Sequence, residues 1–295
     1  MTPSLIEAVD APRPGDEDRY RRVLEEGRIL MFPRTPFALA EEDCALLLRQ
    51  RPSGAGYHKN IAYRPTEDRV TGAAGGSEEG LARVLREYSR SVVQLTSSIL
   101  PSYAARWRVD FASFRSEEEA GRELPLRSRN DLVHVDAFPT RPTRGDRILR
   151  VFTNVNPEAP RVWASGGTFE ELAARFATAS GLLPRSRRAG VDGALRRLAR
   201  AAGLPVALRS PYDRFMLSFH HYLKENRAFQ EEGGKITLRF PAGSTWMVFT
   251  DMVSHAVLAG RYALEQTFIV SRESLALPEK APIAILERIA GVSLR

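Results

Sequence analysis

Short stretches of alternating apolar and polar residues, separated by Gly or Pro, fill much of the second half of the chain. They constrain its fold more than any other feature, and they cover 131–138, 147–156, 235–243, 245–257 and 262–271. Alternation places one side of an extended segment against a core, and tight turns join such segments in antiparallel order. The pattern predicts an antiparallel sandwich or barrel and argues against a parallel sheet built from strand–helix–strand units.

Helical periodicity is clearest in the first half of the chain. Apolar residues recur at three- and four-residue steps over 77–100, which predicts a long amphipathic helix there. Shorter helices are expected over 16–27 and 40–51, and an apolar strand is expected over 28–37 between them.

Together these patterns favour a single domain that spans residues 1–295. We expect a mainly β fold with helical additions: a double-stranded β-helix (jelly roll, cupin-like) core flanked by helices. Residues 1–123 are expected to be a mostly helical N-terminal part packing on the core, and 124–272 to be the core itself. A helical insertion is expected at about 168–232, and a helical tail at 273–295.

The chain carries a net charge of +7, and its basic residues are almost all arginine. Of 43 Lys and Arg residues only four are lysines, against 36 Asp and Glu. Arginine presents a planar fork that suits carboxylates and phosphates, so the charge fits nucleic acid, an anionic membrane surface or an anionic substrate. No helix-turn-helix, RNP or zinc-finger pattern is present, and nucleic acid is therefore not an expected partner.

The apolar and cysteine content indicates a cytoplasmic location. The single cysteine, Cys44, has no intrachain partner for a disulfide, which fits a reducing compartment. No stretch approaches 18 uncharged apolar residues, so no transmembrane helix is expected. The acidic N-terminus, broken by prolines, does not look like a signal peptide.

Two of the five histidines, together with one aspartate, form a pattern with chemical meaning. His134 and Asp136 are two residues apart, so in an extended segment their side chains point to the same side. His255 follows much later, at the end of another predicted strand. A pair spaced like His134 and Asp136 often arises by chance as a surface or hydrogen-bonded pair. The all-β context and the order of the three residues favour a two-histidine, one-carboxylate Fe(II) site.

This order of ligands is found in 2-oxoglutarate-dependent oxygenases, whose cosubstrate has a distal carboxylate that needs a cation. Arg150 and Arg261 are the two candidates, and each could instead be an ordinary arginine at a sheet edge. Asn154 and Thr267 could add hydrogen bonds to the cosubstrate.

The remaining histidines are weaker candidates. His220 and His221 are adjacent on a predicted helix, where neighbours point about 100° apart and do not easily face one metal ion. We expect one of them to pack on the core and assign His221 to the substrate. His58 is expected to be a loop residue.

Two segments carry a more specific signal. The runs RSRNDLVHVDAFPTRPTRGDRILRVFTNVNP (127–157) and SHAVLAGRYALEQTF (254–268) resemble the Kdo (3-deoxy-D-manno-oct-2-ulosonic acid) hydroxylase family, and the resemblance covers about residues 124–270. It implies an Fe(II)/2-oxoglutarate dioxygenase that uses O2 and hydroxylates carbon 3 of Kdo in the lipopolysaccharide inner core, giving Ko. It also implies that His134, Asp136 and His255 hold the iron. It does not identify the arginine for 2-oxoglutarate.

The implied substrate, Kdo-lipid A, is anionic, because Kdo has a carboxylate and lipid A has phosphates. We expect Arg127, Arg129 and Arg144, with His221, to bind it. The protein would then contact the cytoplasmic face of the inner membrane peripherally, as a monomer or a homo-oligomer. Two alternatives stay open: a 2-oxoglutarate oxygenase acting on a protein side chain or small metabolite, and a non-enzymatic basic anion-binding β-sandwich.

Overall fold

The computed structural model describes residues 4–50, 61–73, 78–119, 121–182 and 209–295. The strands are β1 (Ile6–Ala8), β2 (Ile29–Phe32), β3 (Ile61–Arg64), β4 (Arg69–Thr71), β5 (Trp107–Arg115), β6 (Arg147–Asn154), β7 (Arg161–Ser165), β8 (Ile236–Phe240), β9 (Thr245–Phe249), β10 (Ala256–Ala259) and β11 (Ala263–Val270). The helices are α1 (Glu17–Glu25), α2 (Glu41–Arg49), α3 (Glu78–Ile99), α4 (Pro101–Ala104), α5 (Phe169–Phe176), α8 (Pro211–Glu225), α9 (Arg227–Glu231) and α10 (Pro282–Ala290).

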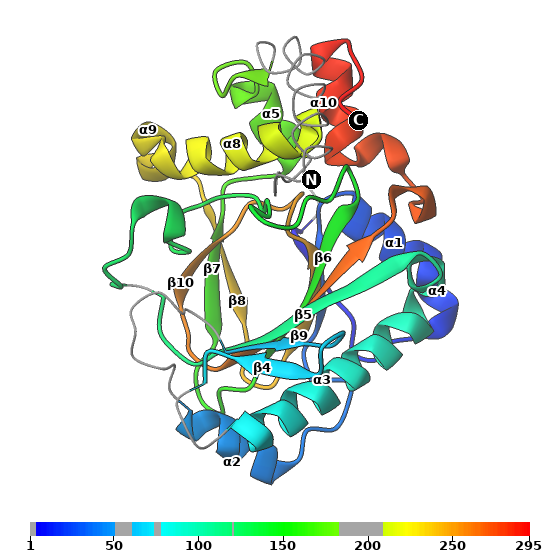
Figure 1. Ribbon diagram of the computed structural model, residues 1–295, viewed down its shortest axis with the longest axis vertical. Coiled ribbons are helices and arrows are strands. Elements are labelled where there is room, and N and C mark those ends of the chain that lie inside the picture. The colour runs from blue at the N-terminus through cyan, green and yellow to red at the C-terminus, as the bar shows by residue number, and fades with distance from the viewer. Residues whose placement is uncertain (1–3, 51–60, 74–77, 120, 183–208) are drawn as a thin grey trace, which may run out of the picture.

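Two sheets form the centre of the molecule (Figure 1). The large sheet has eight strands in the order β1-β2-β9-β6-β11-β5-β3-β4, and the small sheet has three in the order β10-β7-β8. All pairs are antiparallel except β1 with β2. This confirms the predicted antiparallel β core with helical additions, and the arrangement is of the jelly-roll type.

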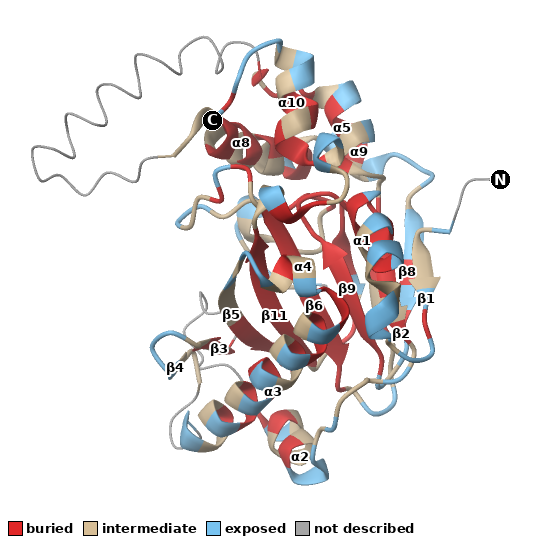
Figure 2. Ribbon diagram, turned by 90° about the vertical axis from the view of Figure 1, so that its right-hand side faces the viewer, coloured by how far each residue is buried: buried red, intermediate tan, exposed pale blue. Residues whose placement is uncertain are grey.

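The long helix α3 covers the outer face of the large sheet (Figure 2). Its apolar stripe is buried, including Leu81, Leu85 and Val92, and the hydroxyl of Tyr88 donates to the carbonyl of Val151 on β6 at 3.2 Å. Each fully buried side chain of this size contributes about 1.5–3 kcal/mol, so the stripe fixes the helix on the sheet.

The N-terminal part was expected to be mostly helical and to pack on the core, and the structure shows that it also contributes strands to the large sheet. It supplies β1 to β5, and β5 lies inside the large sheet between β11 and β3. The sequence of β5, WRVDFASFR, alternates poorly because the strand is buried only over its second half, at 112–115. Strand β7 was not expected either, because the sequence RVWAS begins with an arginine that turns out to be buried.

The segment that carries His134 was expected to be a strand over 131–138. It forms only an isolated bridge, in which His134 pairs with His255. The stretch 245–257, expected as one strand, is divided into β9 and β10 by a turn after Phe249.

Helices α5, α8 and α9 belong to the expected insertion, and with α10 they lie over one end of the sheets (Figure 1). Helices α5 and α8 each begin with a reciprocal capping pair, Thr168 with Glu171 and Ser210 with Asp213, which fixes where the helix starts. The helix expected near 191–203 lies outside the described residues, as does His58.

A buried ion pair supports the turn after β9. The Nε atom of Arg147 lies 2.8 Å from Oδ2 of Asp251, and the side chains are 0% and 1% exposed. The Arg147 guanidinium also lies 4.1 Å from the ring centre of Phe249. In the same turn, the carbonyl of Thr250 accepts a hydrogen bond from the backbone N–H of Asp136 at 2.8 Å. The pair therefore stabilises the turn that holds Asp136.

Replacing Arg147 with Met is expected to lower the free energy of unfolding by about 3–5 kcal/mol, because it leaves the Asp251 carboxylate buried without its partner. Urea denaturation measures the change. The matched control is Arg227→Met, which removes an ion pair whose side chains are 86% and 62% exposed, and its effect should stay below about 1 kcal/mol. Equal effects of the two substitutions would contradict the role given to the buried pair.

Candidate metal centre and adjoining cavity

Two histidines far apart in sequence are brought together by backbone hydrogen bonds. The N–H of His134 donates to the carbonyl of His255 at 3.1 Å, and the N–H of His255 donates to the carbonyl of His134 at 2.8 Å. Both side chains are buried, and their ring centres lie 4.7 Å apart. The local backbone thus places two imidazoles side by side at one end of the sheets.

The ring nitrogens of both histidines have defined roles. Nδ1 of His134 lies 2.7 Å from the carbonyl of Leu132, and Nδ1 of His255 lies 3.0 Å from the carbonyl of Val253. A carbonyl only accepts, so Nδ1 carries the hydrogen and Nε2 keeps its lone pair. Such a partner orients a metal-binding imidazole.

Asp136 completes the group. Nε2 of His134 lies 3.7 Å from its Oδ1, and Nε2 of His255 lies 4.0 Å from its Oδ2. The Oδ2 atom accepts no hydrogen bond from the part of the chain that the structure describes, although Nη1 of Arg150 lies 3.3 Å away. Two imidazole nitrogens and a carboxylate around one point suit a divalent iron ion and leave further positions open.

The electrostatics of the three groups agree with this chemistry. Burial lowers the pKa of His134 and of His255, which keeps the imidazoles neutral. Burial alone would raise the pKa of Asp136, but the charge of Arg150 and the smaller contributions of the other neighbouring groups together outweigh it, and the pKa falls well below its ordinary value. Neutral imidazoles and an ionised carboxylate are the forms that bind a metal.

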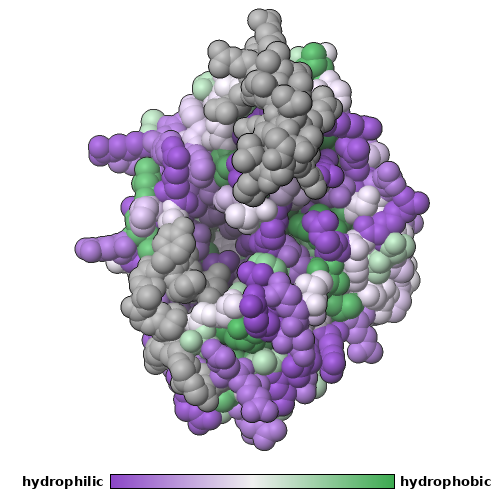
Figure 3. Space-filling model, in the orientation of Figure 1, coloured by the Kyte–Doolittle hydropathy of each residue, from purple (hydrophilic) through white to green (hydrophobic). Residues whose placement is uncertain are grey.

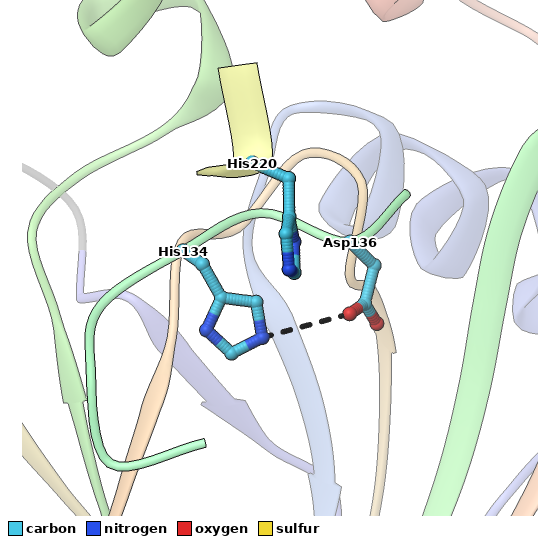
Figure 4. A group of neighbouring side chains, drawn as sticks. All are labelled: His134, Asp136 and His220. Carbon is cyan, nitrogen blue, oxygen red and sulfur yellow. Dashed lines mark ion pairs between the residues drawn. The ribbon is translucent and has the colours of Figure 1, made fainter. Parts of the chain in front are cut away.

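A fourth side chain reaches the same place. His220 extends from α8 toward the gap between His134 and Asp136 (Figure 4), and one ligand atom of each of these three residues lies within 4.8 Å of the others. Nδ1 of His220 lies 2.8 Å from the carbonyl of Val135. Burial lowers the pKa of His220 to about 3. This agrees with the expectation that the two adjacent histidines do not face one metal ion. His220 joins the cluster, whereas His221 lines the adjoining cavity without joining the cluster.

A cavity of about 300 Å³ adjoins the cluster. It is lined by Arg115, Arg127, Ser128, Asn130, His134, Asp136, Ala137, Pro139, Arg150, Phe152, Arg161, Trp163, His220, His221, Lys224, His255 and Val257. In the same orientation as Figure 1, the surface is hollowed near its middle, with hydrophilic side chains around the hollow (Figure 3). The volume and the polar lining suit small anionic molecules.

The three arginines deep in the cavity differ in their partners. Arg115 lies 2.7 Å from Oε2 of Glu265, and Arg150 lies 3.3 Å from Oε1 of the same carboxylate. Arg161 on β7 is 1% exposed, and its Nη1 donates to the backbone carbonyl of Gly260 at 2.8 Å. Within the described residues its Nε has no hydrogen-bond partner, as is also the case for Nε of Arg150. Burial, with the charge of Arg115, lowers the pKa of Arg161 to about 10, which indicates a place for an anion.

The structure separates the predicted cosubstrate residues. Arg150 lines the cavity, but Asn154, Arg261 and Thr267 are not among the residues lining it. Asn154 is fully buried, where its amide donates to the carbonyl of Ala159 at 3.0 Å. Arg261 donates to a backbone carbonyl and covers the ring of Tyr262, and Thr267 is enclosed within β11. The place of Arg261 at the start of the strand after His255 therefore did not predict that its side chain would line the cavity.

The predicted substrate residues divide in the same way. Arg127 and His221 line the cavity, and the side chain of Arg127 pairs with Glu225 at 2.6 Å. Arg129 pairs with Asp131 at 2.6 Å, and Arg144 occupies a turn with φ of 57°. Neither is among the lining residues. The sequence analysis missed Lys224, whose spacing of four residues from His220 places it on the same side of α8.

Acid is expected to destabilise the metal-free protein through His220. Its folded pKa of about 3 lies below its ordinary value of 6.5, so between these values the unfolded chain binds a proton that the folded protein does not. As the pH is lowered through this range, the free energy of unfolding therefore decreases by up to about 1.4 kcal/mol per pH unit for this group. The difference between the urea midpoints at pH 7 and pH 5 should be smaller in His220→Gln than in wild type. An equal pH dependence in the two proteins would contradict the assignment.

Two sheets of the jelly-roll type, with two histidines and an aspartate beside a cavity rich in arginine, define a class: the non-haem iron oxygenases that use 2-oxoglutarate. The profile of the 3-deoxy-D-manno-oct-2-ulosonic acid (Kdo) hydroxylase family matches residues 8–293. The chain belongs to this family, which confirms the predicted Fe(II)/2-oxoglutarate-dependent hydroxylase of Kdo.

Solved structures of the Kdo hydroxylase KdoO, a non-haem Fe(II) alphaketoglutarate-dependent dioxygenase, are similar over nearly the whole chain. The complex with alphaketoglutarate and Fe(III) has 34% identity and a TM-score of 0.82, covering 98% of this chain and 97% of KdoO. The cobalt(II) complex has 34% identity and a TM-score of 0.83, covering 99% and 97%. A comparison with curated protein sequences gave no match.

Proposed function

We propose that this protein hydroxylates carbon 3 of Kdo in Kdo-lipid A, giving Ko, with iron held by His134, Asp136 and His255. The observation that carries the proposal is the convergence of two Nε2 atoms and one carboxylate, with both Nδ1 atoms fixed by carbonyls. The KdoO structures with iron, cobalt or alphaketoglutarate support the same cofactors here.

We assign the distal carboxylate of 2-oxoglutarate to Arg161 rather than to Arg150 or Arg261. Arg161 is buried and lines the cavity, and among the described residues its guanidinium forms no ion pair, whereas Arg150 pairs with Asp136 and Glu265. Gly260 supports this placement: a Cβ there would lie 2.8 Å from Cα of Arg161, so only glycine allows the close approach. A planar guanidinium binds a carboxylate through two parallel hydrogen bonds.

Arg150 has a different part in the proposal. Its Nη1 lies 3.3 Å from both Asp136 Oδ2 and Glu265 Oε1, so it holds the metal-binding carboxylate in place. Trp163 stacks on the ring of His255 at 5.1 Å and packs edge-on against Phe152 at 5.0 Å, which keeps water from that side of the site.

When bound, iron with 2-oxoglutarate and O2 supplies the oxidant that replaces hydrogen by hydroxyl at an unactivated carbon. The residues of this chain bind and orient both substrates so that the target carbon lies next to the metal position.

The decisive assay combines the purified protein with Fe(II), 2-oxoglutarate, ascorbate and Kdo-lipid A. We expect the glycolipid to gain the mass of one oxygen, and we expect no gain when 2-oxoglutarate is omitted. No gain in the full mixture, accompanied by succinate release, would leave an oxygenase with a different substrate, such as a protein side chain or small metabolite.

We further propose peripheral contact with the cytoplasmic face of the inner membrane. In the described part of the chain, no helix combines the length and apolarity needed to cross a bilayer. Leu126, 45% exposed, precedes the exposed Arg127 at the edge of the cavity, a combination suited to an anionic lipid surface. Co-sedimentation with anionic vesicles should weaken in Leu126→Ser.

A further inference from the structure

We propose that one side of α8 recognises the sugar acid itself: Lys224 pairs with the carboxylate of Kdo, and Nε2 of His220 accepts a hydrogen bond from a sugar hydroxyl. The inference rests on the proposed function and assigns two of its substrate contacts. Both residues line the cavity beside the metal centre.

Helices α8 and α9 are joined directly to the segment that carries His134 and Asp136. Gln230 on α9 accepts from the N–H of Val133 at 2.9 Å and donates to the carbonyl of Val133 at 2.9 Å. Nδ1 of His220 donates to Val135 at 2.8 Å, and Nζ of Lys224 donates to the carbonyl of Arg127 at 3.1 Å. These bonds fix the helices relative to the metal-binding residues, so a sugar held by α8 is also held relative to the metal.

His220 is suited to a hydroxyl by its hydrogen bond to Val135. Because that carbonyl accepts from Nδ1, the neutral ring keeps its lone pair on Nε2 and can only accept there. Its partner must therefore bring a hydrogen or be the metal. The expected metal ligands already include two imidazoles and a carboxylate, whereas a sugar acid brings several hydroxyl groups.

Lys224 is suited to the carboxylate by its burial and by its place in the cavity wall beside the metal centre. Its side chain sits in the cavity wall, and the residue is only 3% exposed. The arginines that line the cavity have other contacts or roles: Arg127 pairs with Glu225, Arg115 and Arg150 contact Glu265, and Arg161 is assigned to 2-oxoglutarate. A compact ammonium with three N–H donors can keep its bond to Arg127 and still bind an anion.

The test compares Kdo with its methyl ester, which keeps the hydroxyls but lacks the charge. Calorimetry measures the binding of each to protein loaded with Co(II) and 2-oxoglutarate. We expect wild type to prefer Kdo by about 10- to 100-fold, Lys224→Met to lose that preference, and Lys224→Arg to recover part of it. The control Lys280→Met alters a half-exposed lysine that pairs with Glu170 and should behave as wild type.

The same experiment with His220→Gln and His220→Phe tests the second contact. Both sugars should bind about 10-fold more weakly to His220→Phe, with Co(II) affinity unchanged. A loss of Co(II) affinity in both variants would make His220 a metal ligand and overturn its assignment. The assignment of Lys224 would be overturned if Lys224→Met bound Kdo and its methyl ester more weakly by the same factor, or if wild type bound neither of them. Failure of the proposed function would appear separately, as no oxygen gain on Kdo-lipid A.

Discussion

Replacing Asp136 with Ala is expected to abolish tight metal binding and to lower hydroxylation on the order of 10³-fold or more. Among the described side chains, Asp136 offers the only carboxylate that both imidazole Nε2 atoms approach, at 3.7 and 4.0 Å. A bound metal contributes several kcal/mol to such a reaction, and each 1.36 kcal/mol corresponds to a tenfold change in rate. Titration with Co(II), followed by its visible absorption, measures binding without turnover.

The variant should still fold, because Arg150 keeps a second carboxylate, Glu265, at 3.3 Å. The matched control is Asp18→Ala, which removes a side chain that is 90% exposed on α1. It should bind Co(II) and turn over as wild type does. Wild-type Co(II) affinity in Asp136→Ala would show that the ion binds elsewhere.

The residues proposed to bind the metal could be singled out from the sequence because their signal is local or ordered along the chain. The spacing of His134 and Asp136 needs only an extended backbone, and that backbone is present although the segment forms a bridge rather than a strand. Alternation similarly predicted β6, β8 and β11, whose ends fall within three residues of the expected ones. The family resemblance added the chemistry that the spacing alone could not distinguish from a chance pair.

The other residues of the site could not be predicted in this way, because their roles depend on burial and on partners distant in sequence. Arg150 and Arg161 both begin or interrupt apolar stretches. Nothing in the local sequence indicates that Arg150 forms ion pairs with carboxylates whereas Arg161 bonds to a backbone carbonyl. His220 and Lys224 reach the cavity through the packing of α8 on the segment around Val135. A chain with 39 arginines offers many candidates, and only tertiary structure shows which are buried and which are paired.

Replacing Arg161 with Met is expected to weaken 2-oxoglutarate binding about 100-fold. The substitution keeps the length of the side chain but removes a deep cation of the cavity that bonds to a backbone carbonyl, whereas Arg115 and Arg150 pair with Glu265. A buried charge-assisted pair of this kind contributes about 2–5 kcal/mol, so its loss should appear mainly in cosubstrate affinity. Calorimetry with Co(II)-loaded protein measures this affinity in the absence of turnover.

The controls for Arg161→Met separate the three arginines that have been considered for the cosubstrate. Arg261→Met should bind 2-oxoglutarate as wild type does, because Arg261 contacts the Ser116 carbonyl and the Tyr262 ring outside the cavity lining. Arg150→Met should weaken Co(II) binding first, because Arg150 lies against Asp136. Metal affinity should be unaffected by Arg161→Met. If Arg261→Met lost 2-oxoglutarate and Arg161→Met did not, the position after His255 would be the true carboxylate site despite its place outside the cavity.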